Sequence, residues 1–407
     1  MKMRRVLRHA VVAIDRRLHR DVCISPLTSL TADDVSLIKT ARDFCTVHVK
    51  PVCMKMDETG QMEPEVVSQA FASGLMAIET SEEYGGAGMT FPSTVLAIEE
   101  IARADAAVAL LVDLQNLISG MFVHYANPDQ QREYLPRLSR RSIACFCLTE
   151  PGSGSDAFAL KTAAIDDGDA YVINGTKIFI SSGSIAEIFL VMANVDFAKG
   201  YKGITCFIVD RTAIPGVKIG RIENKLGIRA SSTTEVRFDE VRVPKRNVLG
   251  EVGGGYRLAI ETLNDGRIGI GAQMVGIAQG ALDAAMPYLF ERKQFGRPIG
   301  DFQGMQFQYA QAAMELHTAR LLVYNAARKK MLGEPAVEDA AMAKLFSSQV
   351  AERTASKCVE WMGGCGFMKE FSVERFYRDA KIGAIYEGTS NIQLHTLAKI
   401  TKERYKR

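Results

Sequence analysis

The chain has 407 residues, 47% hydrophobic and 24% charged, which excludes a disordered, fibrous or collagenous protein and predicts two or three domains of about 150 residues each. Its 50 basic and 47 acidic residues give a net charge of +3, but residues 1–20 hold seven basic side chains against one acid. The rest of the chain is mildly acidic, which provides no electrostatic basis for nucleic acid binding.

The N-terminus has the arginine-rich, acid-poor composition of an organelle transit peptide. Its longest apolar stretch, Ala10–Ile14, is too short for the hydrophobic region of a secretory signal. We expect residues 1–30 to be a mitochondrial transit peptide and linker, although a basic tail without a targeting role would have the same composition.

The remainder of the chain shows no sign of a membrane span, a disulfide frame or a metal site. Its longest uncharged stretch, Ile268–Leu282, contains Gln and Gly and falls short of the ~18 apolar residues that cross a bilayer. Eight cysteines without a CxxC pair predict reduced, packed thiols rather than disulfides or zinc ligands.

Three zones follow one another along the chain. Residues 31–142 have helical periodicity, which begins at the capping-box-like TADD of Thr31–Asp34. Residues 143–250 change to a period of two, and the Asn174–Gly175 pair within YVINGTKIFI predicts a hairpin. Residues 251–407 return to long helices with short breaks, which is typical of an antiparallel bundle. The sequence thus predicts an α+β fold in the order α, β, α.

The motif TEPGSGSD, Thr149–Asp156, follows a short apolar run at the start of the β zone. Gly152, Gly154 and Ala157 fit the dinucleotide pattern G-x-G-x-x-G/A. No long helix follows, however, and the acidic residue required about 20 positions later is missing, so a Rossmann nicotinamide site is not expected. The motif is either a plain turn or a loop whose amides and hydroxyls approach a ligand by another route.

The motif IYEGTSNIQ, Ile385–Gln393, precedes the last predicted helix. A residue of Thr389–Asn391 can cap that helix, and the Glu387 carboxylate suits its dipole. The mostly apolar neighbours of Glu387 should also raise its pKa, and a raised carboxylate is what a general base near neutral pH requires. The motif is therefore either a helix cap or the site of a catalytic base.

Five motifs stand in the order found in the acyl-CoA dehydrogenase family, namely TEPGSGSD, the segment with KIFIS, ERKQFGRPI with FQ, EWMGGCG and IYEGTSNIQ. The resemblance covers residues 31–402 and is greatest to the short/branched-chain, 2-methylacyl-CoA members. It implies an N-terminal helical domain, a central β domain and a C-terminal four-helix bundle. It also implies FAD-dependent α,β-dehydrogenation of a 2-methylbutyryl-CoA type of substrate in the mitochondrial matrix, by a homotetramer that passes electrons to electron-transfer flavoprotein.

The resemblance further implies the role of individual residues. Glu387 matches the base that takes the α-proton while flavin N5 takes the β-hydride. The positions that match FAD contacts, some of them reaching from a neighbouring subunit, are Phe146, Cys147, Leu148, Thr149, Glu150, Pro151, Gly152, Ser153, Gly154, Ser155, Phe179, Ile180, Ser181, Arg292, Gln303, Glu360, Trp361, Met362, Gly363, Gly364, Thr389, Ser390 and Asn391. The positions that match acyl-CoA contacts are Ser155, Tyr201, Tyr256, Asn264, Asp265, Gly266 and Arg267.

Two positions depart from other members of the family. Some relatives carry the base where this chain has Gly266, so Glu387 stands here without a competing carboxylate. Phe179 stands where the family usually has Trp, and the loss of the indole N–H bears on electron transfer to the flavoprotein partner.

Two alternative functions stay open at this stage. The same site run in reverse would make the protein a 2-methyl-branched-chain enoyl-CoA reductase, because one transition state serves both directions. A non-catalytic acyl-CoA-binding or assembly protein is the alternative from another class, against which the presence of Glu387 argues. The sequence does not give the direction of the reaction, the exact acyl chain preference or the cleavage site of the presequence.

Overall fold

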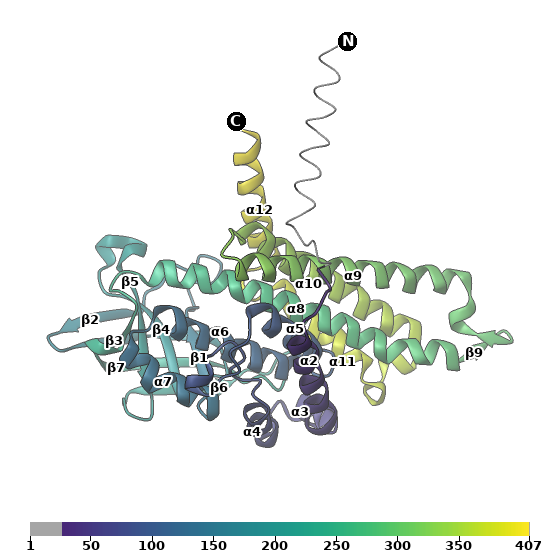
Figure 1. Ribbon diagram of the computed structural model, residues 1–407, viewed down its shortest axis with the longest axis horizontal. Helices are drawn as coiled ribbons and strands as arrows, with labels where there is room; N and C mark the ends of the chain where they lie inside the picture. The colour runs from purple at the N-terminus through teal and green to yellow at the C-terminus, as the bar shows by residue number, and fades with distance from the viewer. Residues whose placement is uncertain (1–26, 407) are drawn as a thin grey trace, which may run out of the picture.

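The computed structural model describes residues 27–406, and Figure 1 shows a β domain on one side and a long helical bundle on the other. The predicted transit peptide and linker, residues 1–30, lie outside the described residues except for the last four. The order α, β, α and the α+β fold class predicted from the sequence are confirmed.

The N-terminal helices are α2 (Ala32–Phe44), α3 (Cys53–Thr59), α4 (Pro64–Ala72), α5 (Phe91–Ala102), α6 (Ala106–Tyr125) and α7 (Pro128–Arg140). The predicted capping box is present at the start of α2, where the Thr31 hydroxyl accepts from Asp34 N at 3.1 Å and the Asp34 carboxylate accepts from Thr31 N at 3.0 Å. Among the described helices, α6 alone is long and apolar enough to cross a membrane, but 78% of that stretch is buried inside the protein. It forms a core helix on which the other domains pack.

The β domain consists of β1 (Ala144–Cys147), β2 (Ala163–Asp167), β3 (Ala170–Ser181), β4 (Ile188–Asn194), β5 (Ile204–Asp210), β6 (Val217–Ile222), β7 (Thr233–Pro244) and β8 (Val248–Leu249). The sheet has the order β6-β7-β3-β2-β4-β5-β8, and β1 pairs in parallel with β4. Both faces of β4 and β5 are buried. Alternate side chains of β4 therefore enter two separate cores, one of which includes α6 and α7.

The predicted hairpin at Asn174–Gly175 is wrong, because β3 runs straight through this pair. The register of β3 against β7 shifts between Ile173 and Gly175, and the freed Asn174 Oδ1 accepts from Glu240 N at 2.9 Å. A Cβ at Gly175 would collide with the Thr162 side chain. The glycine therefore permits a bulge and a close approach, not a turn.

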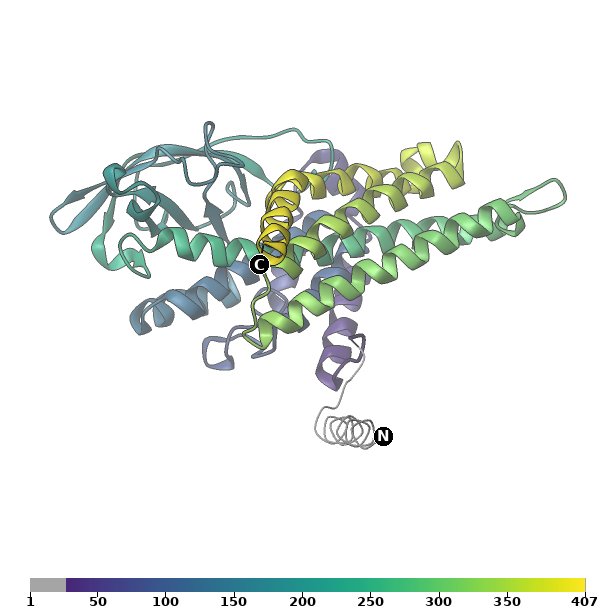
Figure 2. The same ribbon diagram turned by 90° about the horizontal axis from the view of Figure 1, so that it is seen from above.

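The C-terminal part consists of α8 (Gly255–Glu291), the short strands β9 (Lys293–Gln294) and β10 (Arg297–Pro298), α9 (Gln303–Met331), α10 (Val337–Met362), α11 (Val373–Ala380) and α12 (Ser390–Tyr405). Helices α8 to α11 lie side by side as a bundle, and Figure 2 shows α8 running from the β domain to the β9–β10 hairpin at the far tip. The first half of α8 thus lies between the β domain and α6, and its second half belongs to the bundle. The segment that joins α11 to α12 returns to the middle of α8.

Candidate active site

Glu387 lies in a strained turn immediately before α12. It has φ of 50° and the following Gly388 has φ of 84°, so two consecutive residues adopt the left-handed conformation that a side chain disfavours. Three hydrogen bonds hold this turn. Lys344 Nζ donates to Gly388 O at 2.7 Å, while Gln393 Nε2 donates to Gly388 O at 2.9 Å and to Glu387 O at 3.1 Å. The helix cap is a different residue, since the Thr389 hydroxyl accepts from Ile392 N at 3.3 Å. Capping of α12 therefore does not explain Glu387.

One carboxylate oxygen of the half-buried Glu387 is shielded from solvent and has no hydrogen bond to any of residues 27–406. Its Oε2 is buried and has no hydrogen-bond partner among the described residues. Burial raises the pKa of Glu387 above its ordinary value, while the positive charges of Lys344 and Arg267 act in the opposite direction. A buried carboxylate with a free oxygen and a raised pKa is suited to accept a proton from a ligand.

The middle of α8 forms the wall against which this carboxylate lies. A Cβ at Gly266 would stand 2.9 Å from Glu387 Oε2, so only a residue without a side chain leaves the carboxylate where it is. Arg267 Nη1 donates to Asn264 Oδ1 at 2.9 Å, and its buried Nε has no partner among the described residues. Of the NDGR motif, Asn264–Arg267, the structure therefore brings Gly266 and Arg267 to the candidate base, and Asn264 contacts Arg267.

Asp265, the remaining residue of that motif, is engaged elsewhere. Its Oδ2 lies 2.7 Å from Lys330 Nζ on α9, and the same ammonium lies 3.6 Å from the centre of the Phe91 ring. Burial raises the pKa of Asp265 although Lys330 opposes this. Asp265 therefore joins α8 to α9 rather than facing Glu387.

A second buried acid, Asp113 on α6, lies near Glu387 and was not expected from the sequence. Burial raises the pKa of Asp113 well above its ordinary range, and the negative charges of Glu387 and Glu79 add to the effect. A side chain at Gly269, one turn along α8 from Gly266, would collide with it. The only signal in the sequence is an acid inside the apolar run of α6.

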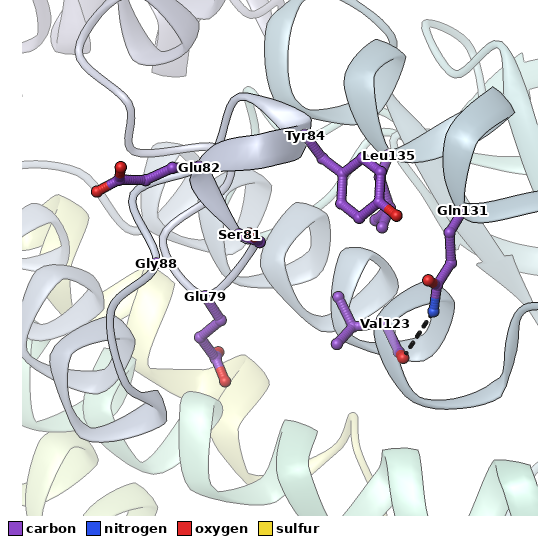
Figure 3. Close-up of a pocket in the computed structure, with 8 residues that line it drawn as sticks. All are labelled: Glu79, Ser81, Glu82, Tyr84, Gly88, Val123, Gln131 and Leu135. Carbon is purple, nitrogen blue, oxygen red and sulfur yellow. Dashed lines mark hydrogen bonds between the residues drawn. The ribbon is translucent and has the colours of Figure 1, made fainter. Parts of the chain in front are cut away.

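A pocket in the described residues lies elsewhere, beside α6 and α7. It has a volume of about 510 Å³. Figure 3 shows its lining residues, with Gln131 Nε2 donating to the backbone oxygen of Val123 at 3.0 Å. None of the predicted site residues lines this pocket, although Glu79 connects it electrostatically to Asp113.

The loop that contains TEPGSGSD is anchored by a second buried glutamate. Glu150 Oε1 lies 2.8 Å from Nζ of the fully buried Lys177 and also accepts from Thr162 N at 3.0 Å. Its Oε2 accepts from Lys161 N at 2.6 Å. Ile178 N donates to Thr149 O at 2.9 Å, so the loop lies beside β3. The predicted stretches 146–155 and 179–181 are therefore neighbours.

This pair of stretches fits a flat aromatic cofactor. Phe179 has φ of 58° within a bulge of β3, and this conformation leaves its side chain 64% exposed. A Cβ at Gly152 or Gly154 would meet nothing within 4 Å, so the backbone of the loop is open to a ligand. An exposed ring beside accessible amides and the Thr149 hydroxyl can contact the face and the polar edge of such a ligand.

The predicted acyl-CoA contacts gather beside the same loop. The rings of Tyr201 and Tyr256 lie 4.5 Å apart, and Phe158, just after the loop, lies 4.4 Å from Tyr256. Ser155 is exposed next to them. These residues form an aromatic mouth at the start of α8, from which the helix leads to Gly266 and Glu387.

Most of the remaining predicted cofactor contacts lie at the opposite end of the bundle, whereas Thr389–Asn391 follow Glu387 directly at the start of α12. Arg292 follows α8 and Gln303 begins α9, while Trp361 Nε1 donates to Gln308 Oε1 at 3.1 Å and so joins the end of α10 to α9. Thirty-six residues separate Tyr256 from Arg292, which is about 54 Å along a straight helix. A single chain therefore does not bring this group to the loop at 146–155.

The comparisons with known proteins agree along the whole described chain. Family models described as acyl-CoA dehydrogenase N-terminal, middle and C-terminal domains match residues 31–142, 145–241 and 253–401. The chain is 52% identical to the mitochondrial short/branched chain specific acyl-CoA dehydrogenase of Bos taurus, over 94% of this chain and 88% of that protein.

Solved structures give the same result. Butyryl-CoA dehydrogenase from Megasphaera elsdenii is similar with a TM-score of 0.90 and 38% identity, over 92% of this chain and 99% of that one. Glutaryl-CoA dehydrogenase from Mycobacterium smegmatis, solved in complex with FADH2, has a TM-score of 0.87 and 30% identity, over 92% and 95%.

Proposed function

The chain belongs to the acyl-CoA dehydrogenase family, and from this premise we propose that it is an FAD-dependent enzyme that oxidises short, branched-chain acyl-CoA esters of the 2-methylbutyryl-CoA type to 2-enoyl-CoA. The observation that carries the proposal is the 52% identity, over almost the whole chain, to a relative named for short/branched-chain specificity. The reductase direction is not favoured, because that relative is named as a dehydrogenase.

In this proposal Glu387 removes the α-proton. Its buried Oε2 has no partner within residues 27–406 that would compete for the incoming proton, and burial favours the protonated form. The positive charges of Arg267 and Lys344 favour the ionised form of the carboxylate, against the effect of burial. When bound, FAD supplies the two-electron acceptor for the hydrogen that leaves Cβ.

We assign the binding of FAD to two sets of residues. The loop at 146–155 and the exposed Phe179–Ser181 segment would line the flavin, for the geometric reasons given above. Arg292, Gln303 and residues 360–364 would hold the rest of the cofactor together with Thr389–Asn391. The length of α8 favours the action of Arg292, Gln303 and residues 360–364 on the FAD of a neighbouring subunit. This arrangement supports a homotetramer as the working form.

We assign the binding of acyl-CoA to the mouth formed by Tyr201, Tyr256 and Ser155 and to the NDGR segment of α8. Gly266 would leave room beside Cα for the 2-methyl group as well as for the base. Phe179 presents a large exposed ring in place of Trp, and we propose electron-transfer flavoprotein as the electron acceptor. A close relative is mitochondrial, so we assign this protein to the mitochondrion and propose the matrix as its compartment.

The test is anaerobic bleaching of the purified yellow protein by 2-methylbutyryl-CoA, butyryl-CoA and isovaleryl-CoA, followed by kcat/KM with an artificial acceptor. We expect 2-methylbutyryl-CoA to lead by about ten- to two-hundredfold, since one methyl group is worth ~1–3 kcal/mol of discrimination. A lead for isovaleryl-CoA would contradict the branched-chain specificity. A colourless protein that binds acyl-CoA without reaction would support the non-catalytic alternative.

A further inference from the structure

Lys344 is a fully buried lysine in α10 whose charge has no carboxylate partner within ion-pair distance in residues 27–406. The lysine that most resembles it, Lys177, is equally buried but lies 2.8 Å from a carboxylate oxygen of Glu150. A buried ammonium without a close counterion is costly, so its position calls for an explanation. The atom it contacts is the backbone oxygen of Gly388, at 2.7 Å.

This contact fixes the turn that carries the candidate base. Glu387 and Gly388 both have positive φ, and such a backbone persists only where the surroundings hold it. Lys344 and Gln393 provide all three side-chain hydrogen bonds to the two carbonyl groups of the turn. On the other side, the carboxylate lies against the backbone of Gly266. Lys344 thus fixes the backbone from which the Glu387 side chain extends, and Gly266 limits the position of its carboxylate.

We propose that Lys344 is a positioning residue for the base: its ammonium fixes the Glu387–Gly388 turn and supplies a positive charge, present at neutral pH, that favours the ionised form of the Glu387 carboxylate. The proposal deepens the function given above and rests on the role of Glu387 as the base.

The ionisable groups that face Glu387 come from α6, α8, α10 and its own segment. Lys344 on α10 and Arg267 on α8 are positive, Asp113 on α6 is acidic, and Tyr386 on the same segment is a phenol that donates to Gln273. Burial lowers the pKa of Lys344 to about 8, and the charge of Glu387 opposes this shift, so the ammonium is charged at neutral pH. Without Lys344, Arg267 would be the remaining cation of this set, and the pKa of Glu387 would rise further.

The experiment replaces Lys344 in the full holoenzyme. K344M is nearly isosteric and removes both the charge and the donor, whereas K344Q keeps a polar group without a charge. The matched control is K381M, which removes an exposed lysine of the same bundle that pairs with Glu352 at 2.7 Å. For each protein, the rate of anaerobic flavin bleaching by 2-methylbutyryl-CoA is measured from pH 5 to pH 10.

Both Lys344 variants should shift the acidic limb of the rate profile to higher pH by about one unit or more, because removal of a nearby opposite charge raises a carboxyl pKa by that amount. On the acidic limb the rate should fall about tenfold for each unit of this shift and recover towards the parental rate at high pH, while K381M should match the parent. The substrate concentration at half-maximal rate should change little.

An acidic limb at the parental position, or a loss of rate that is equal at every pH, would overturn the proposal, since a purely structural role moves no titration. If K344M does not fold, K344Q alone decides by the same criterion. If no acyl-CoA bleaches the parent protein, the proposed function itself is wrong, and so is the proposed role of Lys344. The two failures are therefore distinguishable.

Discussion

Glu150 is a buried glutamate and Glu387 is a half-buried glutamate with one buried oxygen. Each lies near a fully buried lysine, but the hydrogen bonds around the two carboxylates differ. The carboxylate of Glu150 contacts Lys177 directly and accepts two backbone N–H groups, and the pKa of Glu150 is lowered although burial acts against this. At Glu387 the lysine contacts a backbone oxygen instead, one carboxylate oxygen has no partner in the described chain, and the pKa is raised.

The comparison teaches that hydrogen bonding, not burial, separates a structural carboxylate from a reactive one. Each lone pair of Glu150 that a donor occupies makes protonation less favourable, so the side chain remains an anchor for its loop. In Glu387, by contrast, the buried Oε2 has no hydrogen-bond donor among the described residues. The positive charges of Lys344 and Arg267 act on it from a distance. Four predictions follow the comparison, from the largest expected effect to the smallest.

Replacement of the reactive glutamate should abolish catalysis without harm to the fold. E387Q is nearly isosteric but cannot accept the α-proton, so turnover should fall by ~10²–10⁴-fold. The protein should stay yellow, and its melting temperature should match or exceed that of the parent, because a buried ionised group is removed. Residual turnover above about one part in a hundred would remove Glu387 from the role.

Replacement of the lysine at the structural glutamate should have the opposite result. K177M leaves the Glu150 charge buried and unpaired, which should lower the free energy of unfolding by about 3–5 kcal/mol. The control is K245M, an exposed lysine that pairs with Asp166 at 2.8 Å, and it should leave the denaturant midpoint unchanged. Equal stabilities for the two variants would show that the Lys177–Glu150 pair does not anchor the loop.

A methyl group added at Gly266 should move the Glu387 carboxylate without changing the charges around it. In G266A the new Cβ would displace Glu387 Oε2, which is the end of a flexible side chain and can move without disturbing the fold. Because a misplacement of about 1 Å can cost ~10²-fold in rate, kcat/KM should fall roughly ten- to a hundredfold at unchanged stability. Full activity in G266A would mean that the carboxylate does not react from this position.

The pKa values of the two glutamates are shifted in opposite directions, so the two groups should titrate at different pH. The raised pKa of Glu387 means that the base is protonated as pH falls through a value above 4.5, and kcat/KM should then drop about tenfold per pH unit. The lowered pKa of Glu150 means that the stability its charge provides is present above 4.5 and is lost only as pH falls through the lower value. Activity should therefore disappear at a pH where the protein is still folded, as activity and circular dichroism measured on one sample would show.

The parts of this account that depend on local sequence could be predicted. The capping box at Thr31 and the α, β, α order follow from near neighbours and periodicity, and both are present in the structure. The motif IYEGTSNIQ likewise predicted both Glu387 and the cap of the following helix from a single stretch of chain. Gly175 shows the limit, since a local turn signal was overruled by the packing of Thr162 against the glycine.

The groups that tune the base could not be predicted, because they come from distant parts of the chain. Lys344 and Asp113 lie on helices far from residue 387 in the sequence, and each is an ordinary residue in its own helix. No periodicity reveals that a lysine donates to one carbonyl oxygen 44 residues later. Only tertiary packing makes these side chains neighbours of the carboxylate.

The central claim is that Glu387 holds a proton more readily than an ordinary glutamate because it is buried without a full set of hydrogen bonds. Infrared difference spectra between the parent holoenzyme and E387Q, recorded against pH, isolate the C=O stretch of the protonated Glu387 side chain. We predict that this band titrates with a midpoint above 4.5. A midpoint at or below that value would contradict the account, whatever the activity of the variants.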